Sequence, residues 1–156
     1  MYDERMKPTK DRLVEAAAEL LWERGYAGRL RLAAEAALDS GTTALERLGA
    51  YLDTERNPLA GCRVGRLVQA PDVVADDQLR APAGEFFTWL RQRIAGMLAE
   101  GVRDGELRPD TDPEATASLV VATVQGGYVL ARAQQDQAAF RQATEAAKSA
   151  LDRLRA

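Results

Sequence analysis

The chain has 156 residues, 46% hydrophobic and 29% charged, which excludes general disorder and allows one domain or a small head on a larger body. Its net charge of −3 gives no overall attraction to nucleic acid, so DNA binding would need a local basic patch. The absence of histidine excludes histidine-based catalysis, and the single cysteine, Cys62, excludes an intramolecular disulfide and suits a cytoplasmic location. The uncharged run 115–131 is shorter than the ~20 residues of a membrane-spanning helix, so we expect no membrane segment.

The apolar residues have helical spacing almost throughout, and no alternating run predicts a strand, so we predict an all-α protein. A first helix is expected to begin at Thr9, a residue type favoured at the N-cap, and to end at Gly25. The apolar spacing then predicts a second helix over residues 30–39. A third helix is expected from Thr42 or Thr43 to residue 52.

A turn at Asn57-Pro58 precedes a short helix expected at residues 62–69. Residues 70–82 contain two prolines and predict a break, after which residues 84–103 have the spacing of a long amphipathic helix. Asp112 and Pro113 suit the N-cap and first turn of a further helix. The last two helices are therefore expected at about residues 114–134 and 136–155.

The helix expected at residues 114–134 contains two adjacent glycines, Gly126 and Gly127, and further small residues on several faces. A glycine inside a helix costs up to ~1 kcal/mol relative to alanine, so this pair needs a reason. Close approach of another helix, room for a ligand and a break in the helix are the alternatives. We favour close packing, in a four-helix interface that this helix and the last one form with a second copy. The candidate interface residues are Ala122, Gly126, Gly127, Ala131, Phe140, Ala147 and Leu151.

Aromatic and aliphatic residues of the helix at 84–103 are either core residues or the lining of a cavity that binds a small molecule. Trp89 lies outside the main apolar stripe of this helix and faces either a second packing surface or the cavity. Gln125 and Tyr128 share a helix face near the glycines and would anchor polar groups of a ligand. The candidate pocket residues are Phe86, Trp89, Leu90, Met97, Gln125 and Tyr128.

The remaining reactive side chains give no pattern that indicates catalysis. Cys62 is expected to be a small buried hydrophobic residue rather than a reactive thiol. The carboxylates are spread along helix surfaces, and the sequence has no phosphate-binding glycine loop, metal-ligand cluster or nucleophile–base pair. We therefore predict that the protein is not an enzyme and binds neither a metal nor a cofactor.

Two stretches resemble the tetracycline-repressor (TetR) family of transcriptional regulators. TKDRLVEAAAELLWERGYAG, residues 9–28, looks like the first helix of that family. GCRVGRL, followed by a long helix and GELRPDTDPEATASLVVATVQGGYVLARA, is similar to the ligand-binding and dimerisation body of one branch. The resemblance implies an all-α homodimer that binds a palindromic operator and represses transcription. It also implies release from DNA when a small apolar or amphipathic effector enters the body.

The sequence departs from the family pattern between Gly28 and Arg29, where the scaffold helix, turn and recognition helix of a helix-turn-helix are absent. That motif needs roughly 20–30 residues. We therefore divide the chain into a remnant of the DNA-binding head, residues 1–28, and a body, residues 29–156. Three explanations stay open: additional residues in the intact polypeptide, deletion of the segment, or a resemblance that misleads at the front.

The first helix supplies the only candidate DNA contacts. Lys7, Thr9 and Lys10 stand at its start, where side chains and backbone N–H groups either hold a DNA phosphate or form a solvated helix end. Operator DNA is thus an expected partner if the missing head segment exists. The alternative is a helical ligand-binding and dimerisation module that has no DNA-binding activity.

Overall fold

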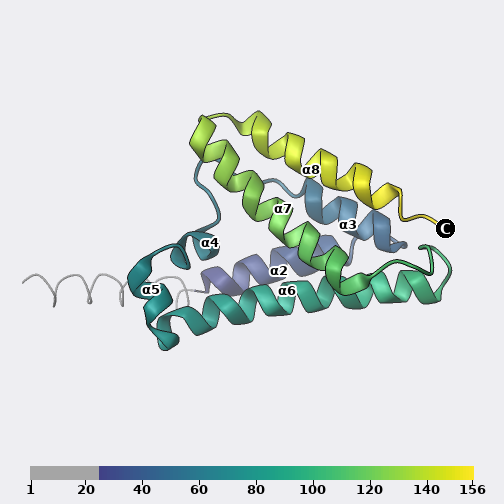
Figure 1. Cartoon of the computed structure of the whole chain (residues 1–156), viewed down its shortest axis with the longest axis horizontal. Helices are drawn as coiled ribbons and strands as arrows, with labels where there is room; N and C mark the ends of the chain where they lie inside the picture. The colour runs from purple at the N-terminus through teal and green to yellow at the C-terminus, as the bar shows by residue number, and fades with distance from the viewer. Residues whose placement is uncertain (1–24) are drawn as a thin grey trace, which may run out of the picture.

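The structure, a computed structural model, describes residues 25–156, which form seven α-helices around one apolar core (Figure 1). The helices are α2 (Tyr26–Leu38), α3 (Ala44–Asp53), α4 (Arg63–Leu67), α5 (Pro71–Ala75), α6 (Asp77–Arg103), α7 (Pro113–Gln134) and α8 (Gln137–Asp152). The predicted all-α fold is confirmed. The first predicted helix, with Lys7, Thr9 and Lys10, lies outside the described residues. No helix within residues 25–156 is both long and apolar enough to span a membrane.

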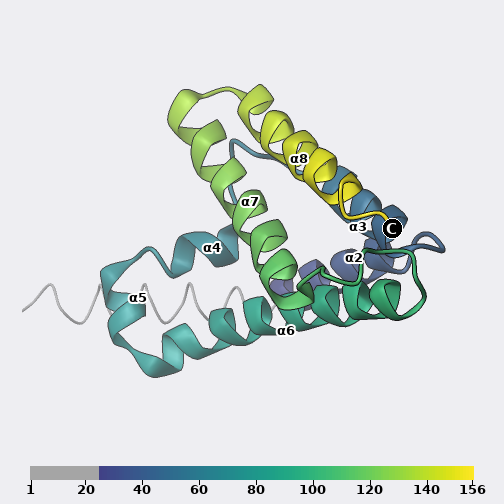
Figure 2. The same cartoon turned by 45° about the vertical axis from the view of Figure 1, so that its right-hand side comes forward.

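The core is enclosed by the five longer helices. α7 and α8 run antiparallel and side by side, and α7 also packs on α6 (Figures 1 and 2). α2 lies along α6, while α3 contacts α2, α6 and α8. Leu38, Leu48, Ile94 and Leu98 are fully buried where these helices meet. The short helices α4 and α5 connect α3 to the beginning of α6 (Figure 1).

α2 begins at Tyr26, four residues before its predicted start, and continues through Gly28 and Arg29 without a break. The Arg29 backbone N–H donates to the Gly25 carbonyl over 2.8 Å, as in a regular helix. Gly25 itself has φ 70°, a conformation that suits glycine because it has no Cβ. The predicted start at residue 30 is therefore wrong, and the proposed boundary between residues 28 and 29 falls within the first turn of α2.

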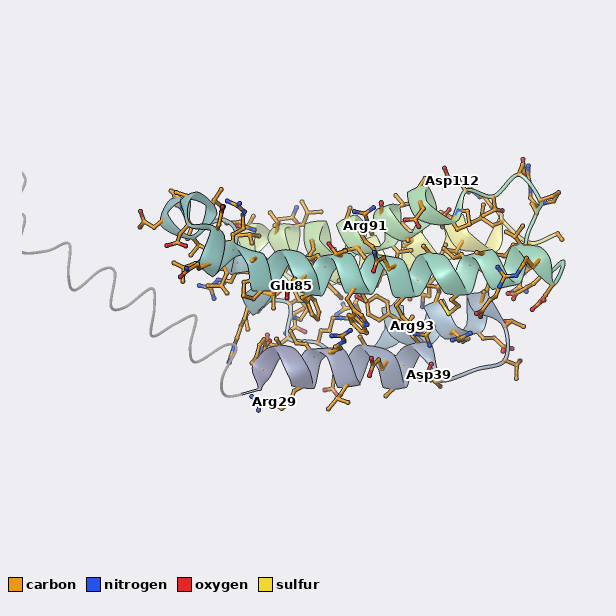
Figure 3. The ribbon with its side chains drawn as sticks, turned by 90° about the horizontal axis from the view of Figure 1, so that it is seen from below. Arg29, Asp39, Glu85, Arg91, Arg93 and Asp112 are labelled. Carbon is orange, nitrogen blue, oxygen red and sulfur yellow. The ribbon has the colours of Figure 1, made fainter. Side chains whose placement is uncertain are left out.

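An arginine cluster fixes the C-terminal end of α2. Arg93 of α6 forms an ion pair of 2.5 Å with Asp39 (Figure 3). Arg47 of α3 donates through its Nε to the Leu38 carbonyl over 2.5 Å and lies 3.6 Å from Asp39. A positive group at a helix C-terminus offsets the partial negative charge there. These contacts attach the end of α2 to both α3 and α6.

α6 begins at Asp77, not at residue 84, so the predicted break at residues 70–82 is too long. Only Ala70 and Asp76, on either side of α5, are non-helical there. The Asp76 side chain accepts from the backbone N–H groups of Gln78 and Leu79, which is ordinary N-capping. Pro71 opens α5 at a position where a helix needs no N–H from it. Pro82, by contrast, lies inside α6 and removes one intrahelical hydrogen bond, close enough to the helix start for the helix to continue.

Two carboxylates hold the N-terminal end of α3. Thr43 and Glu46 form a capping box, and hydrogen bonds, first from the Thr42 backbone N–H, lower the pKa of Glu46 to about 2. Glu106, in the loop after α6, accepts from the backbone N–H groups of Ala44 (2.8 Å) and Leu45 (3.0 Å). Glu106 therefore caps a helix that is remote from it in the sequence.

Replacing Glu106 by alanine should lower the free energy of unfolding by about 1–2 kcal/mol, because two N–H groups of α3 lose their acceptor. Urea denaturation of the variant would measure this loss. Asp110→Ala is the matched control, since Asp110 pairs, among residues 25–156, only with the exposed Arg108. Equal stability of the two variants would contradict the role of Glu106.

Candidate ligand cavity and helix surface

A cavity of about 140 Å³ lies between α2, α3, α6 and α7. It is lined by Leu30, Ala33, Ala34, Tyr51, Thr54, Glu55, Arg56, Cys62, Phe86, Leu90, Val124, Gln125 and Tyr128. Most of these side chains are apolar or aromatic, with a few polar groups among them, which is the usual composition of a small-molecule site.

The structure brings together four of the six predicted pocket residues: Phe86, Leu90, Gln125 and Tyr128. Trp89 faces another surface, where the Arg31 guanidinium lies 4.3 Å from the centre of its ring. Met97 is 1% exposed and belongs to the central core. Those two side chains therefore do not line this cavity.

α2 also lines the cavity, a contribution that was not predicted from the sequence. Leu30, Ala33 and Ala34 line one side of it. Their spacing of three and four residues places them on one helix face, so the pattern was present in the sequence. Tyr51 and Arg56 come from the end of α3 and could not be placed from local sequence. Arg56 donates to the Tyr51 carbonyl over 2.7 Å and thereby caps that helix end.

Tyr128 and Tyr51 are the two phenols of the cavity. The Tyr128 ring lies 4.8 Å from the ring of Phe140, which supports it from α8. Burial raises the pKa of both tyrosines above their ordinary value of 10.0. Both phenols therefore stay neutral at physiological pH.

These raised pKa values predict a loss of stability at alkaline pH. The folded protein holds the two phenolic protons more tightly than the unfolded chain does, so their contribution is complete below pH 10.0 and is lost as pH rises through the raised values. We expect the free energy of unfolding, measured in urea, to fall above that pH. The Tyr51→Phe/Tyr128→Phe variant should show a shallower fall, and an unchanged slope would contradict this assignment.

A second cavity of about 100 Å³ adjoins the first and shares Cys62, Gln125 and Tyr128 with it. Gly65 makes room here, because a Cβ at this position would be 2.3 Å from the Gln125 Oε1 atom. Cys62 is half-buried, and its Sγ accepts from the Gly65 backbone N–H over 3.4 Å. Cys62 lines both cavities. Its partial exposure differs from the prediction of a buried hydrophobic residue.

The predicted interface residues separate into two groups. Gly127, Ala131, Phe140, Ala147 and Leu151 are buried within the protomer, where α7 packs against α8 of the same chain. A Cβ on Gly127 would lie 3.0 Å from the Phe140 ring, so this glycine permits close packing inside one protomer. These five residues are core residues in the fold. Ala122 and Gly126, in contrast, are exposed.

The exposed side of α7 is uncharged over most of its length. Leu119, Val129 and Leu130 are 52%, 51% and 47% exposed, and with Ala122 and Gly126 they form what we call the outer face of α7. A Cβ on Gly126 would meet no atom within 4 Å. Exposed apolar residues gathered along one helix are typical of a protein interface.

The described residues thus define an all-α domain that combines a partly open, mostly apolar cavity between its helices with an uncharged outer helix face. Within residues 25–156 no cluster of side chains could hold a metal ion.

Comparison with known protein families identifies the family of this chain. The sequence model of the tetracyclin repressor-like C-terminal domain matches residues 43–147, more than half of the chain. The chain therefore belongs to the TetR family of transcriptional regulators, as the resemblance predicted. Members of this family are regulators and not enzymes.

Two solved structures have the same fold. A TetR family transcriptional regulator from Cytophaga hutchinsonii superposes with a TM-score of 0.71 and 22% identity, over 82% of this chain and 66% of that one. A TetR transcriptional regulator from Chloroflexus aurantiacus J-10-FL gives a TM-score of 0.74 and 24% identity, over 95% and 75% of the respective chains. The present chain thus covers 66% of the length of the Cytophaga hutchinsonii protein, about two thirds. No curated protein matches it.

Proposed function

We propose that residues 29–156 are the effector-binding and dimerisation body of a transcriptional repressor that binds operator DNA as a homodimer and is released by a small molecule. The observation that carries this proposal is the cavity beside α2. α2 begins at Tyr26, directly after Gly25, and contains the junction where the family places its DNA-reading element. A ligand in the cavity would contact Leu30, Ala33 and Ala34 and so favour one position of α2 over another.

The homodimer in this proposal forms through the outer face of α7, with α8 beside it. The exposed positions Leu119, Ala122, Gly126 and Leu130 follow one another at intervals of three or four residues, so they lie along one side of the helix. Gly126 allows another helix to approach closely, because within residues 25–156 no atom lies within 4 Å of a Cβ placed on it. Four-helix packing between two copies would remove this apolar surface from water.

The second candidate is a ligand-binding and dimerisation module that does not bind DNA. The continuity of α2 favours it, because no residues stand between Gly28 and Arg29 to form a recognition helix. Phosphate contacts from the start of the first helix would position a protein on DNA without selecting a sequence.

A mobility-shift assay of the intact protein, with the DNA upstream of its own gene and a scrambled duplex as competitor, distinguishes the two candidates. The repressor proposal predicts a specific complex at low salt that the scrambled duplex does not displace. Absence of a complex at low salt supports the module without DNA-binding function. Displacement of the complex by the scrambled duplex as readily as by unlabelled upstream DNA supports it as well.

A further inference from the structure

We propose that the ligand of this protein is a small amphipathic anion whose carboxylate is held by Arg66 and Arg132 in the second cavity. Its apolar part lies in the cavity between α2, α3, α6 and α7, called the main cavity here because four of the predicted pocket residues line it. This inference rests on the proposed function, since it names the chemistry of the ligand that the same body would bind. It is carried by the position of two arginines, by the lack of acidic groups around them and by the continuity of the two cavities.

Arg66 and Arg132 converge from different helices on one point beside Gly61. A Cβ placed on that glycine would lie 2.9 Å from the Arg132 Cδ and 3.4 Å from the Arg66 Cδ. Gly61 has φ 77° and no side chain, so the two arginine chains can pass over it. Both arginines line the second cavity, together with the amide side chains of Gln69 and Gln125.

No carboxylate lines this second cavity. Arg47, Arg93 and Arg108 pair with acidic residues elsewhere in the fold, whereas within residues 25–156 no ion pair joins Arg66 or Arg132 to an acidic group. The only hydrogen bond of the Arg66 guanidinium in that range is a long one, of 3.5 Å, to the Ala60 carbonyl. Both side chains line the same cavity, and each guanidinium presents a fork of N–H donors suited to a carboxylate.

The apolar part of the ligand would extend from there into the main cavity. Cys62, Gln125 and Tyr128 line both cavities, so one molecule can reach from the arginines to Phe86 and Leu90. The main cavity, of about 140 Å³, is the size of one that holds a single benzene ring. A ring-sized group joined by a short linker to a carboxylate fits these dimensions, and the neutral phenol of Tyr128 stands between the two parts.

Isothermal titration calorimetry at neutral pH with 3-phenylpropionate and with its neutral analogue 3-phenylpropanamide tests this inference. We expect the wild-type protein to bind the carboxylate at least about tenfold more tightly than the amide, because charge-assisted hydrogen bonds form only with the anion. In the Arg66→Gln/Arg132→Gln variant this preference should fall to within about twofold. All four arginines are exposed, but Arg141 and Arg153 line neither cavity. The Arg141→Gln/Arg153→Gln variant removes the same net charge and should keep the preference.

Equal affinity of the wild type for the two probes, or a preference that persists in the Arg66→Gln/Arg132→Gln variant, would overturn the anion site and leave the apolar cavity as a binding site. Failure of both probes to bind the folded wild type at millimolar concentration would also overturn the effector site in the proposed function. Circular dichroism of each variant confirms that the loss of preference occurs in a folded protein.

Discussion

Replacing Leu119 and Leu130 together by glutamate should convert a dimeric protein into a monomer. Both side chains are about half exposed on the outer face of α7, at 52% and 47%. In a two-fold symmetric interface the double substitution would bury four carboxylates in an apolar contact without partners, which is strongly unfavourable. We expect the dissociation constant of the dimer to rise at least about 100-fold, measured by sedimentation equilibrium or light scattering at micromolar protein.

Leu32→Glu is the matched control for this prediction, because Leu32 is 66% exposed on α2 and lies outside the outer face of α7. That variant should remain dimeric. A wild-type protein that is already monomeric at micromolar concentration would contradict the dimer itself. A Leu119→Glu/Leu130→Glu variant that stays dimeric would place the interface elsewhere.

Replacing Gly127 by valine should be the most destabilising single glycine substitution in α7. A Cβ alone would lie 3.0 Å from the Phe140 ring and 3.4 Å from the Ala143 Cβ, so a branched side chain would force α7 and α8 apart. Overpacking of this kind costs about 1–3 kcal/mol, and we expect the upper part of that range in the free energy of unfolding. Urea or thermal denaturation followed by circular dichroism measures it.

Gly96→Val on α6 provides the comparison, because Gly96 is also helical and exposed and has no atom within 4 Å of a Cβ placed on it. Valine has a slightly better helix propensity than glycine, so this variant should stay within about 0.5 kcal/mol of the wild type. If Gly127→Val were equally harmless, the close packing of α7 against α8 would be contradicted.

The two adjacent glycines of α7 show what could be predicted from this sequence and what could not. Close helix packing was the preferred explanation for both, but the sequence does not say which partner each one meets. In the fold Gly127 faces α8 of the same chain, whereas Gly126 faces open space. Successive residues of an α-helix point about 100° apart, so adjacent glycines can lie on the inner and the outer face of the same helix.

Helix ends were predictable where the signal is local. Asp112 and Asp136 accept backbone N–H groups at the starts of α7 and α8, close to the predicted positions. The start of α6 was less predictable, because Pro82 favours a break in the local sequence although a proline near the N-terminal end of a helix removes only one hydrogen bond.

Contacts between distant residues were not predictable in the same way. Glu106 caps α3 across more than 60 residues, and Arg66 and Arg132 meet over Gly61 only because α4 packs near the end of α7. Among the pocket candidates, Phe86 and Trp89 are three residues apart in α6, yet only Phe86 lines the main cavity. Which of two neighbouring side chains faces a cavity depends on helices that the local pattern does not place.

The central claim is that a small molecule binds in the cavity between α2, α3, α6 and α7, and the thiol of Cys62 reports on it directly. Cys62 is the only cysteine in the sequence, is half-buried and lines both cavities, so the rate of its labelling by iodoacetamide depends on their occupancy. At a concentration of 3-phenylpropionate that saturates binding in calorimetry, we predict labelling at least about threefold slower than in the free protein. An unchanged labelling rate at saturation would show that the probe binds elsewhere and would contradict the claim.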